Sequence, residues 1–87
     1  EQNIIANLSI YPNPTTENFT LNLQSKEAQS ITCELISLTG DVLYSKNEDI
    51  KEGENTITLP TIGIAKGNYL VRITSGGVYS TFSVVLN

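Results

Sequence analysis

Residues 67–86 read GNYLVRITSGGVYSTFSVVL, and this stretch decides the fold class. It contains two runs with a period of two, at 68–74 and 78–86, which is the pattern of β-strands that bury one face. The Gly76-Gly77 pair between the runs is a strong signal for a tight hairpin. The alternating positions that we expect to face inward are Tyr69, Val71 and Ile73 in the first run and Phe82, Val84 and Leu86 in the second.

The rest of the chain repeats this alternation, and no window shows apolar residues at helical spacing over three turns. Turn signals separate the runs, among them Pro12-Asn13-Pro14 and Leu38-Thr39-Gly40-Asp41. Seven strands at spacings of roughly 8–12 residues predict an all-β fold, a seven-stranded immunoglobulin-like antiparallel β-sandwich. We expect a connection at 24–29 and an acidic loop after Lys46. The five further strands are expected at 7–11, 18–23, 31–35, 42–46 and 56–59.

Composition excludes several classes of function. The 87 residues include no His and one Cys, and the net charge is −4. Without His, the usual general base and the commonest zinc ligand are both absent, and one Cys cannot form an internal disulfide. An acidic chain repels a phosphate backbone, and no apolar run approaches the roughly 20 residues of a membrane helix. The sequence therefore predicts one small non-catalytic domain with no cofactor, no nucleic-acid partner and no membrane insertion.

Two groups could carry chemistry, and for both we favour an inert role. Four acidic residues with interleaved lysines are expected to share one loop, but they lack the alternating ligand pattern of a calcium loop, so we expect a solvated charged segment. Cys33 has no His to activate it and alternates with apolar residues, so we expect a small core residue. The four acidic residues are Glu48, Asp49, Glu52 and Glu54.

The four tyrosines are the candidates for an aromatic binding platform, which would suit a carbohydrate. They are expected on different strands and no Trp accompanies them. Tyr69 follows Gly67 at the start of a strand, which is the arrangement of a tyrosine corner. We expect structural roles for Tyr11 and Tyr69, and the roles of Tyr44 and Tyr79 stay open.

Three landmarks occur in order along the chain. The first is Tyr11-Pro12-Asn13-Pro14, at the end of a short strand. The second is residues 35–42, where a strand ends, a turn with a glycine follows and the next strand begins. The third is the strand at residues 67–73. A last apolar strand follows them. Together they resemble the C-terminal sorting domain of the type IX secretion system, type A, over residues 7–87. One departure is the end of the chain, where the family often has a basic pair before the apolar stretch and this sequence has none.

The resemblance implies a function. Such domains direct an upstream passenger from the periplasm across the outer membrane of a Gram-negative bacterium. A surface peptidase of sortase type then usually removes them, and the passenger is secreted or held at the cell surface. The family fold is a seven-stranded sandwich. In this scheme residues 1–6 are the end of a linker from the passenger, and residues 7–87 are the sorting domain.

We expect the motif positions to stabilise the fold and the last strand to be recognised by the export machinery. Strand addition at the edge of the sheet is the binding mode that we expect. The alternatives are an appended sandwich that binds carbohydrate or protein, and a structural spacer. The structural positions are Pro12, Asn13, Pro14, Gly40, Gly67 and Tyr69. The recognition candidates are Val84, Val85, Leu86 and Asn87.

Overall fold

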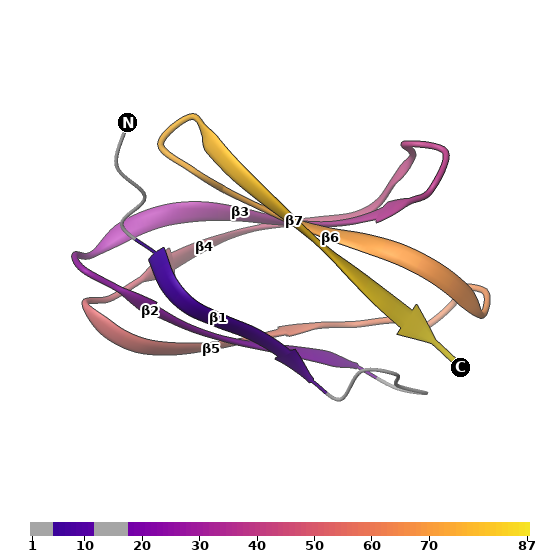
Figure 1. The fold of residues 1–87 in the computed structure, drawn as a ribbon, viewed down its shortest axis with the longest axis horizontal. Helices are drawn as coiled ribbons and strands as arrows, with labels where there is room; N and C mark the ends of the chain where they lie inside the picture. Colours follow the sequence, from indigo (N-terminus) through magenta and orange to yellow (C-terminus); the bar gives the residue numbers. More distant parts are fainter. Residues whose placement is uncertain (1–4, 12–17) are drawn as a thin grey trace.

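Seven strands form two antiparallel sheets that pack face to face (Figure 1). The computed structural model describes residues 5–11 and 18–87. The predicted all-β, seven-stranded sandwich is confirmed. The strands are β1 (Ile5–Tyr11), β2 (Phe19–Ser25), β3 (Gln29–Ser37), β4 (Val42–Ile50), β5 (Gly53–Leu59), β6 (Gly67–Ser75) and β7 (Val78–Leu86).

The chain passes between the sheets three times, as in an immunoglobulin-like fold. One sheet has the strand order β1-β2-β5 and the other has the order β4-β3-β6-β7. In an antibody constant domain the fourth strand belongs to the first sheet, whereas here β4 pairs with β3. The order leaves β7 at one edge of the larger sheet and β4 at the other.

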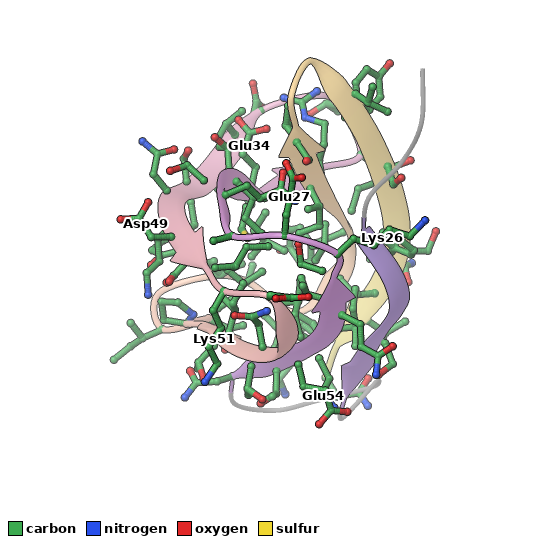
Figure 2. All side chains as sticks on the ribbon, turned by 90° about the vertical axis from the view of Figure 1, so that its left-hand side faces the viewer. Lys26, Glu27, Glu34, Asp49, Lys51 and Glu54 are labelled. Carbon is green, nitrogen blue, oxygen red and sulfur yellow. The ribbon has the colours of Figure 1, made fainter. Side chains whose placement is uncertain are left out.

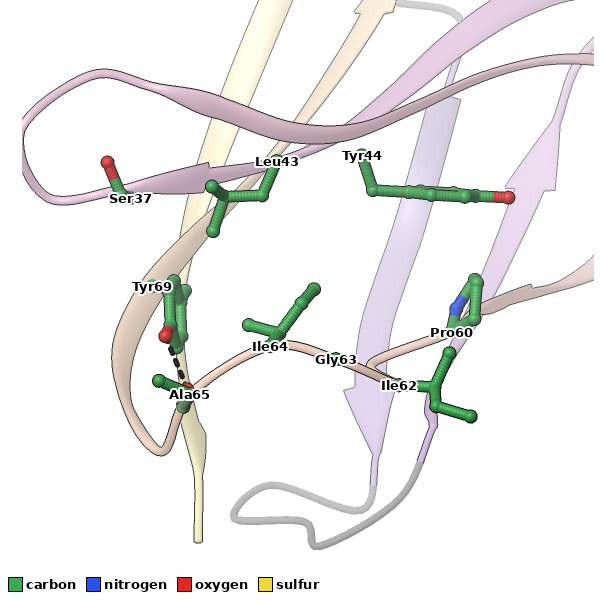
Figure 3. A pocket seen from close by; sticks show the side chains of 9 residues that line it. All are labelled: Ser37, Leu43, Tyr44, Pro60, Ile62, Gly63, Ile64, Ala65 and Tyr69. Atoms are coloured by element: carbon green, nitrogen blue, oxygen red, sulfur yellow. Dashed lines mark hydrogen bonds between the residues drawn. The ribbon is translucent and has the colours of Figure 1, made fainter.

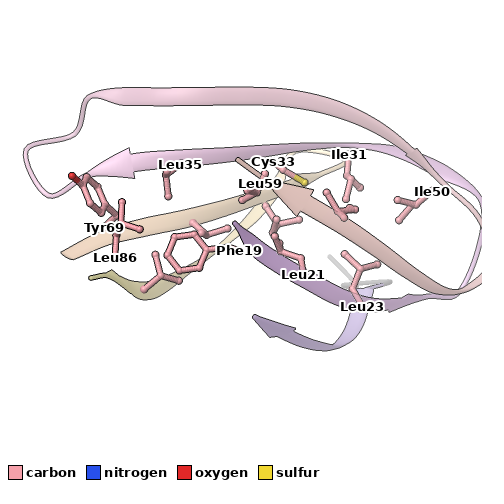
Figure 4. Close-up of a cluster of buried hydrophobic side chains, with 14 residues drawn as sticks. Phe19, Leu21, Leu23, Ile31, Cys33, Leu35, Ile50, Leu59, Tyr69 and Leu86 are labelled. Carbon is pink, nitrogen blue, oxygen red and sulfur yellow. The ribbon is translucent and has the colours of Figure 1, made fainter. Parts of the chain in front are cut away.

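The core lies between the inward faces of the two sheets, as the alternation predicts (Figure 4). Three strands contribute complete rows of buried side chains, and the end of β7 adds Val84 and Leu86. Phe82 packs against this cluster at its margin. Burial of such side chains from water is the main favourable term in folding. The rows are Phe19, Leu21 and Leu23 in β2, Ile31, Cys33 and Leu35 in β3, and Tyr69, Val71 and Ile73 in β6.

The prediction of an acidic loop after Lys46 is wrong. β4 continues to Ile50, so Glu48 and Asp49 are strand residues, and Glu54 lies in β5. Charged residues are depleted from strands in general, but the edge of a sheet is open to water and tolerates them, inward-pointing charges included. Asp49 points to the outer face, whereas Lys46 and Glu48 share the inward face with their β3 partners Cys33 and Ile31. Lys46 Nζ lies 2.5 Å from Glu48 Oε2 at the open edge of the sheet. Figure 2 shows Asp49, Lys51 and Glu54 pointing outward at the end of the sandwich that carries the β4–β5 turn.

Two other segment boundaries move by a few residues. Gln24 and Ser25 belong to β2 and Gln29 to β3, so the expected connection shrinks to residues 26–28. Strand β1 begins at Ile5. Among residues 5–11 and 18–87, no helix is long and apolar enough to cross a membrane.

Candidate functional site

One end of the sandwich gathers most of the sequence landmarks. We call it the C-terminal pole, and it comprises the β3–β4 turn, the β5–β6 connection and the last residues of β7 (Figure 1). The strand register brings them together: Ser37 pairs with Tyr69 across β3 and β6, and Gly67 pairs with Leu86 across β6 and β7. Segments about 20 to 50 residues apart in the sequence therefore share one surface region.

The β5–β6 connection is fixed by a tyrosine corner, as the sequence predicts. The Tyr69 hydroxyl donates a hydrogen bond to the backbone oxygen of Ala65, four residues upstream (Figure 3). The Ile64 amide donates to the oxygen of Thr61 at 3.1 Å, which closes a turn in the same connection. Gly67 has a φ of 149°, where a side chain is strained. Its predicted positive φ is confirmed.

The β3–β4 turn is closed by a compact set of hydrogen bonds. The Ser37 amide donates to the oxygen of Asp41 at 2.9 Å, and the Gly40 amide donates to the oxygen of Ser37 at 3.0 Å. The Ser37 hydroxyl accepts from the Asp41 amide at 3.0 Å. Gly40 has the positive φ that the sequence predicts, 98°. The turn therefore has a defined shape despite its exposure.

A groove of about 600 Å³ opens between the start of β4 and the β5–β6 connection (Figure 3). Tyr44 and Tyr69 both line it, so the structure brings together two of the four tyrosines. The opposite wall comes from the connection, with Pro60 and Ile64. Its volume lies within the usual range of small-ligand pockets, roughly 300–1,000 Å³. Sequence analysis missed this groove, because its walls come from segments that only the crossover between sheets brings together.

A bulge in β4 explains why two neighbouring residues share the groove. Tyr44 pairs with Leu35 and Val42 pairs with Ile36, so Leu43 is an extra residue on β4. In a regular strand, neighbours point to opposite faces; a bulge re-aims a side chain. Both Leu43 and Tyr44 consequently line the groove. Nothing in the sequence alternation announces this extra residue.

The four recognition candidates at the end of β7 fall into two groups. Val84 and Leu86 are 1% and 5% exposed and belong to the core, so their side chains are closed to a partner of the folded domain. Val85 is half-buried and Asn87 is exposed. A partner that binds the folded domain at this end of β7 would therefore contact Val85, Asn87 and the backbone.

The other aromatic candidates do not join the groove. Tyr79 lies on β7 near the β6–β7 hairpin, at the other end of the strand, and is 64% exposed. The Arg72 guanidinium lies 5.8 Å from its ring centroid, and Arg72 Nε donates to Glu34 Oε1 at 2.7 Å, which raises the pKa of Arg72. The side chain of Tyr11 and residues Pro12, Asn13 and Pro14 lie outside the part that the structure describes.

The remaining titratable candidates form no reactive centre. Cys33 is fully buried, and burial, reinforced by the Glu48 carboxylate, raises the pKa of its thiol to about 11. A thiol with a raised pKa is a poor nucleophile at neutral pH. The hydrogen bond to Glu48 raises the pKa of Lys46. Within the described residues, no three Cys, Asp or Glu side chains form a group that could hold a metal ion.

The described residues form a small seven-stranded β-sandwich whose sequence landmarks gather at one pole. Residues 9–87 match the family described as the secretion system C-terminal sorting domain, and the chain belongs to this family. The sequence-based resemblance is thereby confirmed, and with it the assignment to type IX secretion and to the cell surface or exterior.

A curated relative is similar over most of the chain. Ulvan lyase NLR42 of Nonlabens ulvanivorans is 29% identical over 84 residues. The match covers 93% of this chain and 15% of the lyase, so the chain spans a small fraction of the relative's length.

Proposed function

We propose that this domain is the sorting signal of an upstream passenger, which it directs from the periplasm across the outer membrane. The observation that carries the proposal is the family match over residues 9–87. The partner is the outer-membrane type IX export machinery, and it binds the folded domain. The passenger is then secreted or held at the cell surface, after a sortase-type peptidase removes the domain.

The domain boundary that we propose places the end of a passenger linker in residues 1–6 and the sorting domain in residues 7–87. Ile5 and Ala6 already lie in β1. In the unprocessed protein, the last residues of the linker would therefore enter the sandwich directly, and a peptidase would cut upstream of them.

The last strand is the part of the domain that we propose the machinery binds. Strand β7 lies at the edge of the larger sheet, and residues 78–86 include no charged residue and no proline. Charges, prolines and bulges are the usual devices that keep an edge from pairing with other chains. The other edges carry such devices: β1 and β4 have irregular registers, and β5 carries Glu54. Strand addition along β7 is the docking mode that fits this difference.

A second function, a carbohydrate-binding module, is favoured by one observation, which is the meeting of Tyr44 and Tyr69 in the groove. Sugar sites also need polar groups that fix hydroxyls. The Tyr69 hydroxyl already binds the Ala65 oxygen, and the Ser37 hydroxyl already accepts from Asp41. The sorting function is therefore the better supported of the two.

The test uses two fusions in a host that has the type IX apparatus. Both carry a signal peptide and a reporter ahead of Glu1; one ends at Asn87 and the other continues into a small folded domain. The sandwich folds in both, because β7 ends at the surface. We expect the first reporter outside the cell and the second in the periplasm. If both reporters are exported equally, the machinery does not recognise the free end of the last strand. If neither reporter is exported although both fusions are folded, the sorting function is refuted in that host.

A further inference from the structure

Exposed aliphatic side chains concentrate at the C-terminal pole. Among the described residues, four of the five large hydrophobic side chains that remain exposed lie in its two connections or beside them. Ile62, in the β5–β6 connection, is 94% exposed. Single exposed apolar residues are normal, but a contiguous group is a sign of an interaction site. The other three are Leu38 at 65%, Val42 at 48% and Leu43 at 44%.

The exposure of Ile62 is imposed by the local structure. Thr61 on one side of it is buried, and its oxygen accepts the Ile64 amide. Further along, the Tyr69 hydroxyl anchors Ala65. A connection held at both positions cannot swing its apolar side chain inward, so Ile62 stays presented at the rim of the groove.

The charge distribution makes this pole distinct from the opposite one. The described residues that line the groove are all uncharged. More charges gather in the turns and strand ends at the far end, where Figure 2 shows Lys26, Glu27, Asp49, Lys51 and Glu54, whereas the two connections of the pole carry Asp41 and Lys66. A groove with uncharged walls complements an uncharged apolar partner, and the charges of Asp41 and Lys66 beside it cancel, so they give no net attraction to an anionic lipid surface.

The size of the patch indicates how tightly it binds. The exposed fractions of the four side chains add up to about two and a half residues. Even at the roughly 250 Å² of a large aromatic residue, the patch amounts to no more than about 630 Å². A stable complex of standard size buries about 800 Å² on each partner. Two copies of this chain would therefore not form a stable dimer through the pole, whereas a larger protein can use it in a transient contact.

We propose that the groove, with Leu43 and Ile62 at its rim, is a second docking site of the sorting domain. Its occupant is an uncharged apolar segment of a protein of the export machinery, bound transiently. The inference rests on the proposed sorting function and adds a contact that is separate from the edge of β7. The transient contact suits a signal that has to leave its receptor after export.

The test compares Leu43→Ser/Ile62→Ser with a control, Lys26→Ser/Glu27→Ser, which removes two exposed side chains of opposite charge from the β2–β3 turn, away from both the groove and β7. All are fused behind a signal peptide and a reporter. Loss of two exposed apolar contacts weakens binding by about tenfold, so we expect the external reporter to fall about that much for the double variant and to stay near the parent level for the control. Melting curves of the isolated domains check that all three fold.

The outcomes separate the inference from the proposed function. If the parent is exported and the double variant equally so, the groove inference is wrong while the sorting function stands; if the parent is not exported, the sorting function fails first. A photo-crosslinker in place of Ile62 should join the domain to a protein of the export machinery, and Leu43→Ser should remove that product. Dimerisation of the isolated domain, or binding to phosphatidylglycerol vesicles or to a soluble polysaccharide, that the double variant abolishes would overturn the proposed occupant.

Discussion

Removing a single oxygen atom from Tyr69 tests whether the tyrosine corner holds the C-terminal pole together. Tyr69→Phe keeps the buried ring and deletes the donor to the Ala65 oxygen. A net hydrogen bond contributes roughly 0.5–1.5 kcal/mol, and a buried group left without its partner costs roughly 1–3 kcal/mol. Ala65 is exposed, so water replaces part of the lost bond. We therefore expect a destabilisation of about 1–1.5 kcal/mol.

The assay is urea unfolding of the isolated domain at 25 °C, followed by circular dichroism. For a domain of this size, about 1 kcal/mol corresponds to roughly 4–8 °C in the melting temperature, which a thermal scan measures independently. The matched control is Tyr79→Phe, the same deletion on an exposed ring, for which we expect a change within about 0.5 kcal/mol. If Tyr69→Phe is no less stable than Tyr79→Phe, the corner does not stabilise the fold.

Three further expectations follow from the structure. Gly67→Val should destabilise by about 1–3 kcal/mol because of the positive φ, whereas Asn68→Val on the exposed side of the same strand should not; equal urea midpoints would contradict this. Burial raises the pKa of the Cys33 thiol to about 11, so the thiol of the unfolded chain ionises first as the pH rises above 9. Between pH 9 and 11 the free energy of unfolding of the parent should therefore fall by up to about 2–3 kcal/mol more than that of Cys33→Ala. Parallel curves of unfolding free energy against pH for the two proteins would exclude this effect. A chelator should leave the thermal midpoint unchanged, since we infer no metal in the fold, and a fall of many degrees would reveal a metal site.

The sequence predicts the fold of this chain well because its signals are local. The alternation of Tyr69, Val71 and Ile73 and the Gly76-Gly77 pair each follow from backbone geometry over a few residues. The tyrosine corner is also local, because Tyr69 reaches only four residues back to Ala65. Such features do not depend on how the two sheets are placed relative to each other.

The errors and omissions have physical causes of another kind. Charged residues at 48 and 49 indicated a loop, but β4 is an edge strand whose open side accommodates them. The groove depends on the bulge at Leu43 and on a connection from the opposite sheet. Neither leaves a periodic signal, and Ile62 is an ordinary aliphatic residue until the structure shows its exposure.

The most direct test of the central claim measures where a reporter ends up. A signal peptide, the reporter and residues 1–87 are joined and expressed in two strains that differ only in the presence of the type IX export apparatus. The account predicts that the reporter reaches the surface or the medium in the first strain and stays in the periplasm in the second. An identical distribution in the two strains, with the sandwich shown to be folded in both, would contradict it.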